Sequence, residues 1–405
     1  MTTKVLHTPY EKKDAHNALS MPVYDNVAFD FDSAEAMEKA FCGRSADHTY
    51  SRITNPTVQH FEKRVRTMTD AMNVTALSSG MAAISNTLLN IASQGSNIVT
   101  SAHLFGNTYS FLTATLGKFG VEARFCNLSD PDEVRRTVDN KTCCIFLEII
   151  TNPQQEVADL KALSAIAEAQ GIPLIADTTI VPFTAFRAAD LGVHIEIISS
   201  TKYISGGATS LGGLIIDYGN FSWKNSPVLT THIKSAGEKN AFTARLRTEV
   251  HRNVGAYMTP HAAYMQSLGL ETLDLRFRQQ ATTCLHLAQR LRTLSGIVAV
   301  NYTGLEDNPF HPISLAQFGP LPGAMLTFDL PSREHCFAFM NRLLLIRRAT
   351  NLFDNKSLAI HPASTIFGTF SEEQRQSMDV SQLTIRLSVG LETVDALFED
   401  IRQAL

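Results

Sequence analysis

Short apolar segments alternate with longer segments of helical periodicity between residues 74 and 217. The apolar segments are VTALSS, SNIVTS, CCIFLEII, IPLIAD, IEIISS and LGGLIID, and stretches such as MAAISNTLLNIA and VADLKALSAIAEAQG lie between them. Strands that alternate with helices of this length indicate an α/β domain with a mostly parallel sheet. Helices cover both faces of such a sheet, which explains why IPLIAD and CCIFLEII are almost continuously apolar.

Two further regions flank the α/β pattern. Residues 1–60 are polar and are interrupted by several prolines and Gly43, which is typical of an arm that packs on a neighbouring subunit. Residues 61–255 contain the α/β pattern. From 256 to 405, a long amphipathic segment that starts at Leu270 and the final stretch ETVDALFEDIRQAL indicate a smaller α+β domain. We therefore predict an arm, a large domain and a small C-terminal domain.

The composition narrows the class of partner. The chain of 405 residues is 44% hydrophobic and 18% charged, with a net charge of -4, which is ordinary for a globular protein and gives no sign of nucleic-acid or anionic-membrane binding. The first residues contain no apolar signal segment, and no later segment reaches the length of a membrane span. We expect a cytoplasmic protein that acts on a small molecule.

The six cysteines do not form a CxxC pair, and several lie among apolar neighbours. Buried free thiols are the expected state, and a metal site or a disulfide is the alternative. The sequence predicts no metal site.

Asp177 ends the apolar segment IPLIAD. Ligands of parallel sheets bind beyond the carboxyl ends of the strands, so this side chain is expected to face a ligand crevice. An unpaired carboxylate there is costly to desolvate. A cationic ligand group such as a protonated pyridine nitrogen resolves this cost. A helix cap is an equally good account of Asp177 taken alone.

The next strand ends in a group of hydroxyl side chains beside a lysine, in the order Ser199-Ser200-Thr201-Lys202. Hydroxyl groups at this spacing can bind a phosphate while the lysine reaches a neighbouring aldehyde. A surface loop is the alternative. The position of Asp177 one strand earlier, 25 residues upstream of Lys202, favours a shared site because both side chains then point into one crevice.

Three other residues are candidates on weaker grounds. Gly80 lies where a strand passes into a helix, and the free N–H groups of a helix N-terminus bind anions, although such a junction is often only a turn. Phe105 follows the strand SNIVTS and either stacks on a flat ring or belongs to the core. Arg386 interrupts an apolar strand, where it either binds an amino-acid carboxylate or forms a structural salt bridge.

The chain also contains an ordered series of motifs over nearly its whole length. They are Tyr50-Ser51-Arg52, Asn55-Pro56-Thr57, Ser79-Gly80-Met81, Glu148 with Thr151-Asn152-Pro153, Asp177, Ser199-Ser200-Thr201-Lys202-Tyr203, and Ile385-Arg386-Leu387-Ser388-Val389-Gly390-Leu391-Glu392. In their order and spacing they resemble the Cys/Met-metabolism family of enzymes that depend on pyridoxal 5′-phosphate (PLP). The resemblance implies fold type I of the PLP-dependent transferases.

The resemblance assigns roles to these residues. It implies that Lys202 holds PLP as a Schiff base and moves protons, that Asp177 pairs with the pyridine nitrogen, and that Asn152 lies near the ring hydroxyl. The implied phosphate cradle consists of Gly80, Met81, Ser199 and Thr201, completed by Tyr50 and Arg52 from a neighbouring subunit. Members of the family are typically tetramers built from two active dimers, so we expect a homotetramer.

The segments Gly269-Leu270-Glu271-Thr272 and Lys356-Ser357-Leu358-Ala359-Ile360-His361-Pro362 look most like those of O-acetylhomoserine sulfhydrylases. The implied reaction converts O-acetyl-L-homoserine and sulfide or methanethiol into homocysteine or methionine. A γ-lyase acting on methionine or cystathionine is the runner-up, but the pattern of methionine γ-lyase has a cysteine where this chain has Asn107. A catalytically inactive binding protein with the same fold is the third possibility.

Two departures concern the substrate half of the site. The stacking residue of the family is usually a tyrosine whose hydroxyl assists proton transfer, and Phe105 lacks that group, so the resemblance leaves this catalytic work to Lys202 or Tyr50. The usual Ser-Leu-Gly near the substrate carboxylate is Asn351-Leu352-Phe353 in this chain. We expect Asn351 and Arg386 to contact the substrate.

Overall fold

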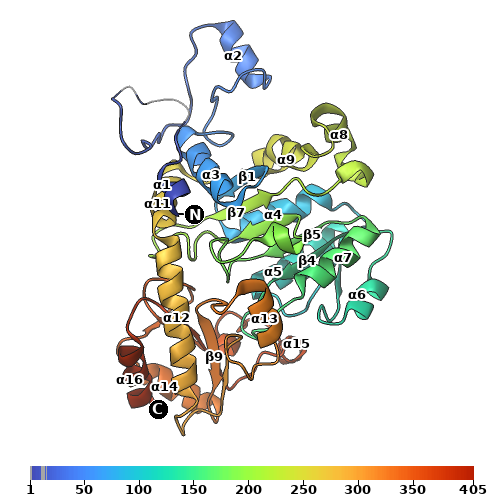
Figure 1. Cartoon of the computed structure of the whole chain (residues 1–405). Coiled ribbons are helices and arrows are strands. Elements are labelled where there is room, and N and C mark those ends of the chain that lie inside the picture. Colours follow the sequence, from blue (N-terminus) through green and yellow to red (C-terminus); the bar gives the residue numbers. More distant parts are fainter. Residues whose placement is uncertain (1, 11–13, 15) are drawn as a thin grey trace.

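The computed structural model describes residues 2–10, 14 and 16–405. Residues 1, 11–13 and 15 of the predicted arm lie outside the described part of the chain. Figure 1 shows two sheets, one above the other, with helix α2 and its flanking segments standing clear of both sheets at one end of the molecule.

The larger sheet has seven strands, and most of the connections between them contain a helix. In spatial order the strands are β1 (Asn73–Leu77), β7 (Gly213–Asp217), β6 (Ile195–Ile198), β5 (Leu174–Asp177), β4 (Thr142–Glu148), β2 (Asn97–Thr100) and β3 (Glu122–Phe125). Strands β3, β2, β4, β5 and β6 pair in parallel, and β7 is antiparallel to both of its neighbours. The predicted α/β class with a mostly parallel sheet is confirmed.

Alternate residues of a central strand lie in two separate hydrophobic cores. In β4, Phe146 packs in the core that contains Leu88 of helix α4 (Gly80–Ile91), and Leu147 packs in the core that contains Leu163 of helix α7 (Leu160–Gln170). All four side chains are fully buried. Burial on both faces is the reason that CCIFLEII is continuously apolar.

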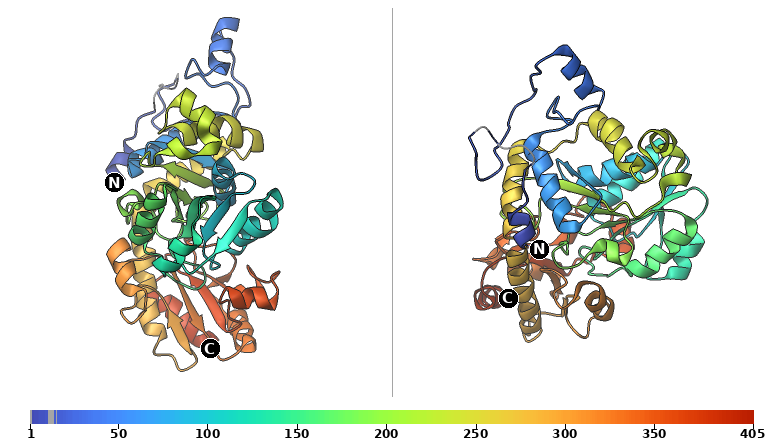
Figure 2. Two further views of the ribbon diagram at one scale, coloured as in Figure 1. Left: turned by 90° about the vertical axis from the view of Figure 1, so that its right-hand side faces the viewer. Right: turned by 45° about the horizontal axis from the view of Figure 1, so that its top comes forward.

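The helices cover the faces of the sheets, and two of them connect the sheets. The remaining α-helices of the N-terminal half are α1 (Thr2–Leu6), α2 (Ala34–Phe41), α3 (Pro56–Thr69), α5 (Gly106–Ser110), α6 (Pro131–Thr137), α8 (Thr230–Ala236), α9 (Ala241–Arg245) and α10 (His251–Val254). Those of the C-terminal half are α11 (Pro260–Glu271), α12 (Leu273–Leu291), α13 (His311–Phe318), α14 (Arg333–Arg342), α15 (Glu372–Ser377) and α16 (Val394–Ala404). Helices α11 and α12 run along the side of the molecule from the larger sheet to the smaller one (Figures 1 and 2).

The smaller sheet has five strands. In spatial order they are β10 (Arg347–Arg348), β11 (Leu358–Ile360), β12 (Thr384–Ser388), β9 (Met325–Asp329) and β8 (Ala299–Asn301). All its pairings except β10 with β11 are antiparallel. The α+β character expected for the C-terminal region agrees with this sheet, whereas the domain limits at residues 60 and 255 stay a prediction.

The hydrophobic pattern failed where burial is partial. The pattern did not indicate strand β3, whose residues are half-buried or exposed, because the sequence Glu-Ala-Arg-Phe is not an apolar run. The single helical pattern over 105–120 is α5 followed by one turn of π-helix and one of 3₁₀-helix. The long amphipathic pattern from Leu270 to Leu294 is divided between two helices, which meet at Thr272.

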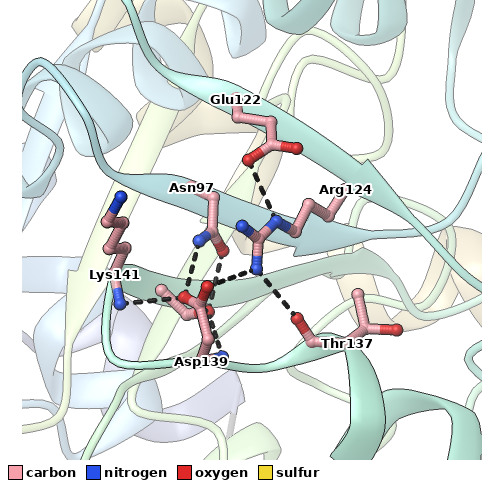
Figure 3. A network of polar contacts seen from close by, with 7 residues as sticks. Asn97, Glu122, Arg124, Thr137, Asp139 and Lys141 are labelled. Atoms are coloured by element: carbon pink, nitrogen blue, oxygen red, sulfur yellow. Dashed lines mark hydrogen bonds and ion pairs between the residues drawn. The ribbon is translucent and has the colours of Figure 1, made fainter.

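A cluster of polar side chains ties three strands together at the end of the sheet where β2, β3 and β4 begin (Figure 3). We call it the amino-edge cluster, and it comprises Asn97, Glu122, Arg124, Asp139, Lys141 and Thr142. Asp139 accepts hydrogen bonds from the Arg124 guanidinium at 2.7 Å, the Asn97 amide at 2.9 Å and the Lys141 backbone N–H at 2.8 Å. These donors, Arg124 above all, hold the pKa of the Asp139 carboxyl well below its usual range.

The described residues contain no sign of a membrane span, a metal site or a disulfide. Among these residues, no helix is both long and apolar enough to cross a membrane, and no cluster of metal-ligating side chains occurs. All six cysteines are free thiols, and four of them are buried.

Candidate active site

Three neighbouring strands end at one edge of the larger sheet, opposite the amino-edge cluster, where the sequence predicts a ligand crevice. Glu148 ends β4 and Asp177 ends β5, and the two residues are direct partners in the register of these parallel strands. The loop after β6 carries Lys202, and the charges of Lys202 and Asp177 lie close enough to influence the pKa of the Asp177 carboxyl. The predicted meeting of Asp177 and Lys202 at one sheet edge is confirmed.

A short turn after β5 connects Asp177 to the lysine loop. The backbone N–H of Thr179 donates to the Asp177 carboxylate at 2.9 Å, and the Thr179 hydroxyl accepts a hydrogen bond from the backbone N–H of Ser199 at 2.8 Å. No α-helix begins after Asp177 before α8, so the helix-cap interpretation of this residue is wrong. Its carboxylate is held by a turn just beyond the end of β5.

Glu148 is a second acid of the site, and the residue-by-residue sequence reasoning missed it. It accepts a hydrogen bond from the backbone N–H of Phe105 at 2.7 Å, which fixes the start of helix α5. Burial and the neighbouring Asp177 raise the pKa of Glu148 to about 8. Burial also raises the pKa of Asp177, against the opposing effects of Thr179 and Lys202. The signal in the sequence was an acid inside the apolar run CCIFLEII.

Lys202 is shielded from water and reaches across to the C-terminal region. Its ammonium group donates to the Asn351 side-chain oxygen at 2.8 Å. Burial and the nearby Arg386 charge lower the pKa of Lys202 to about 8, and Asp177 opposes the shift. About a tenth of this lysine is therefore uncharged at pH 7 and able to act as a nucleophile, far more than for an ordinary lysine.

The first turn of α4 lies against the lysine loop. A Cβ atom on Gly80 would stand 2.6 Å from the Ser199 Cβ atom, so only glycine allows this approach. Ser79 caps the helix by accepting the Ala82 N–H at 3.0 Å, which leaves the N–H groups of the first residues without intrahelical partners. Such an N-terminus beside a serine hydroxyl is suited to a phosphate group.

The other predicted cradle residues have further contacts. The Thr201 hydroxyl donates to the Gly212 carbonyl oxygen at 3.1 Å and accepts the Gly212 N–H at 3.0 Å, so one lone pair remains for another partner. The Met81 sulfur accepts a hydrogen bond from the Thr108 hydroxyl at 3.8 Å. The part of Met81 and Thr201 in binding a phosphate stays a prediction.

Arg386 lies in the middle of β12 and is 2% exposed. Its guanidinium donates to the Asn152 side-chain oxygen at 3.3 Å and to the carbonyl oxygens of Thr350 at 3.0 Å and Asn351 at 3.3 Å, and no described acid pairs with it. Its Nε atom is buried without a described partner. Burial lowers its pKa to about 9. The structural salt bridge considered from the sequence is wrong, and the group has capacity for an anion.

Tyr50 and Arg52 lie apart from this constellation in their described contacts. The Arg52 guanidinium stands 5.4 Å from the centre of the Tyr50 ring and donates to the Arg252 carbonyl oxygen at 2.6 Å. Tyr50 is 39% exposed. Both belong to the segment before α3, so their role in a neighbouring subunit's site stays a prediction.

The residues present fit a phosphorylated pyridine aldehyde. Two adjacent and partly buried acids, Glu148 and Asp177, have raised pKa values, so a protonated ring nitrogen would supply a cation that stabilises their ionised forms. Lys202 offers an amine to the aldehyde, and the start of α4 at Gly80 offers N–H groups to the phosphate.

Comparison with known proteins agrees with this fit. The family model described as Cys/Met metabolism PLP-dependent enzyme matches residues 2–405. The chain belongs to this family. It is therefore a PLP-dependent enzyme, and its cofactor is PLP. The fold expected from the sequence, type I of the PLP-dependent transferases, is confirmed.

Relatives in the family include two activities. The chain is 32% identical to the O-acetyl-L-homoserine sulfhydrylase of Corynebacterium glutamicum, over 98% of this chain and 95% of that protein. It is also 32% identical to the L-methionine gamma-lyase of Pseudomonas putida, over 100% of this chain and 96% of that protein.

Two solved structures are similar as well. The O-acetylhomoserine sulfhydrylase of Wolinella succinogenes is 44% identical, with a TM-score of 0.78 over 88% of this chain and 99% of that chain. A putative O-acetylhomoserine (thiol)-lyase of Campylobacter jejuni is 31% identical, with a TM-score of 0.92 over 100% of this chain and 99% of that chain, and its structure contains a pyridoxyl-lysine phosphate.

Proposed function

We propose that the enzyme replaces the γ-acetoxy group of O-acetyl-L-homoserine with sulfide or methanethiol, releasing acetate and forming homocysteine or methionine. Sulfhydrylases of this kind are among its relatives at 32% and 44% identity. The observation that carries the proposal is the placement of Arg386, which is buried, lacks an acidic partner among the described residues and influences the pKa of Lys202. A cation there suits the carboxylate of an amino acid whose α-carbon lies beside the lysine.

Lys202 and Asp177 have complementary tasks in this proposal. Bound PLP supplies an electron sink that accepts the electrons of the broken Cα–H bond. With a pKa of about 8, the Lys202 amine would remove the α-proton of the bound substrate and then a β-proton, and acetate would leave Cγ. After the sulfur nucleophile has added at Cγ, the same amine would return protons to Cβ and Cα. Asp177 keeps the ring nitrogen protonated, and Arg386 holds the substrate in register through these steps.

Because Phe105 has no hydroxyl group, more of the proton transfer falls to Lys202. Phe105 precedes α5, and its backbone is held by Glu148 at 2.7 Å, so its ring is well placed to stack on a flat cofactor. Phenylalanine has no proton to give. Proton transfer therefore rests with Lys202, assisted by Tyr50 of a neighbouring subunit.

Assembly is part of the proposal. The segment before α3 carries apolar side chains with little cover in the single chain, such as Leu19 at 99% exposed and Val27 at 62% exposed. We infer a homotetramer in which this segment packs on a neighbouring subunit and brings Tyr50 and Arg52 to its site. Mixing an Arg52→Ala variant with a Lys202→Ala variant should restore activity in hybrid dimers, and no recovery after verified subunit exchange would contradict the shared site.

A γ-lyase is the second candidate, because the methionine gamma-lyase of Pseudomonas putida is also a relative, at 32% identity. The two reactions are separated by incubating the PLP-loaded enzyme with O-acetyl-L-homoserine, with and without sulfide or methanethiol, and with methionine alone. Thiol-dependent formation of homocysteine or methionine is the expected result. Release of 2-oxobutyrate from methionine at a comparable rate would replace the transferase with the lyase.

A further inference from the structure

Phe353 has an unusual backbone conformation for a large side chain. It lies in the loop between β10 and β11 and has a φ angle of +55°, in the left-handed region that favours glycine. Its side chain is fully buried. A glycine would adopt this φ without steric cost, so the phenylalanine ring must contribute more than the conformation costs.

The contacts of Phe353 connect the two halves of the site. Its ring stacks on the Tyr203 ring with the centroids 4.1 Å apart and the planes 5° from parallel. Its backbone N–H donates to the Ser388 hydroxyl at 2.6 Å. Tyr203 directly follows Lys202, and Ser388 lies two residues after Arg386 on the same strand, which places both on the same face.

The same loop holds the two functional cations. The carbonyl oxygens of Thr350 and Asn351 accept hydrogen bonds from Arg386, and the Asn351 side chain accepts one from Lys202 at 2.8 Å. Each of these acceptors is displaced if the loop moves. Tyr203 is itself fixed, because its hydroxyl accepts the Ala324 N–H at 2.9 Å. The Phe353–Tyr203 stack therefore ties the loop to an anchored ring.

We propose that Phe353 is a positioning residue: its stack on Tyr203 holds the loop 350–354 so that Arg386 and Lys202 present one pocket to the carboxylate and amine of an amino-acid substrate. The inference rests on the proposed function for the identity of the substrate class. It does not depend on which sulfur nucleophile reacts.

The substitution Phe353→Gly sets two effects of opposite sign against each other. Glycine relieves the left-handed backbone, which favours the folded state, but it removes the stack, which loosens the loop. We expect the KM for O-acetyl-L-homoserine to rise about 3- to 10-fold, the range that corresponds to losing one aromatic pair, with kcat changed less than about 2-fold. Ala208, exposed and also left-handed at φ +55°, provides the matched control Ala208→Gly, which should leave both constants unchanged.

A binding measurement keeps the inference separate from turnover. L-Norvaline has the amine and carboxylate of the substrate but no leaving group, and its binding to PLP-loaded enzyme is followed by the change in cofactor absorption. Its affinity should fall by the same factor in Phe353→Gly, while the absorption spectrum before addition stays as in the unmodified enzyme. Absence of sulfhydrylase activity in every form would refute the proposed reaction and still leave this measurement decisive.

A double-substitution cycle tests whether the stack itself is the connection. Phe353→Leu and Tyr203→Leu keep an apolar side chain at each position, so they guard against a glycine variant that fails to fold. In the combined variant the loss of L-norvaline affinity should be clearly smaller than the product of the two single losses. Unchanged affinity in Phe353→Gly or Phe353→Leu, or losses that simply multiply, would overturn the proposal.

Discussion

Acidic residues near the two ends of strand β4 have pKa values that are shifted in opposite directions. At the amino-edge cluster, Asp139 receives an arginine, an amide and a backbone N–H, and its pKa is held well below the usual range (Figure 3). At the other end, Glu148 and Asp177 lie side by side, and burial raises the pKa of both. Asp139 therefore has enough donors to stay ionised, whereas the positive charge of Lys202 does not offset the burial of Glu148 and Asp177.

Loss of Lys202 should give the largest effect. Lys202→Ala removes the amine that joins the cofactor, so the visible absorption of PLP-loaded enzyme and its turnover should both disappear, while thermal stability stays the same or rises because a buried amine is gone. Lys141→Ala at the amino-edge cluster is the matched control, since its described bond to Asp139 comes from the backbone. A Lys202→Ala variant that kept either signal would refute the assignment of the site.

Substitution of Asp177 at the end of β5 and of Asp139 just before β4 should separate function from stability. Asp177→Asn leaves the ring nitrogen without its ionic partner, and kcat should fall by about 10²- to 10³-fold, the usual effect of removing one electrostatic contact at a reacting centre. Asp139→Asn should leave kcat unchanged and lower the thermal midpoint instead, because it weakens contacts to Arg124 and Asn97. Steady-state kinetics and thermal scans of both variants measure this. Equal losses of kcat in the two variants would contradict the assignment of Asp177 to catalysis and of Asp139 to stability.

The cofactor half of the site follows from the sequence for a physical reason. Parallel strands bring their carboxyl ends to one edge, so the residues that end consecutive apolar runs, Asp177 and Lys202, had to meet. The same rule identifies Glu148, although the run CCIFLEII continues past it and hides the end of the strand. Gly80 followed from the strand-to-helix junction, which the close approach of Ser199 now explains.

The contacts on the substrate side of the site could not be predicted from the sequence and became visible only in the structure. Arg386 lies in mid-strand, where an arginine is as well explained by a salt bridge, and only its carbonyl and amide partners exclude that. The contact between Asn351 and Lys202 joins residues 149 positions apart, and no periodic pattern encodes it. Phe353 departs from local preference at its φ angle, and the compensating ring of Tyr203 is equally remote in sequence.

The pH dependence of cofactor uptake should test the lowered pKa of Lys202. The pKa of Lys202 is lowered to about 8, so its uncharged fraction rises about tenfold between pH 7 and pH 9. The rate at which the PLP-free protein acquires the absorption of bound cofactor should rise by a similar factor over this interval. Stopped-flow absorbance at a fixed PLP concentration measures it, after the separately measured titration of free PLP is divided out. A rate that kept rising to pH 10 would mean an ordinary lysine.

Substitution of Glu196, which lies inside the larger sheet, should give the smallest effect, a change in how the free energy of unfolding depends on pH. Glu196 is fully buried on β6 and accepts hydrogen bonds from the hydroxyls of Thr178 and Tyr218. Burial raises its pKa above the ordinary 4.5, so the folded chain binds this proton more tightly than the unfolded chain. The associated stability is fully present below pH 4.5 and is lost as the pH rises through the folded pKa.

The variant Glu196→Gln carries no such titration. Compared with the unmodified enzyme, it should differ by less than about 1 kcal/mol in free energy of unfolding at low pH and gain relative stability as the pH is raised to 9. Urea unfolding at pH 5 and pH 9 measures this. Glu334→Gln is the control that should show almost no change between these pH values, because hydrogen bonding to Ser332 lowers the pKa of that exposed acid and places its titration below pH 4.5. If Glu196→Gln instead lost relative stability at pH 9, the folded chain would favour the ionised carboxylate at this position. Burial without a nearby cation would then not explain the raised pKa values of Glu148 and Asp177.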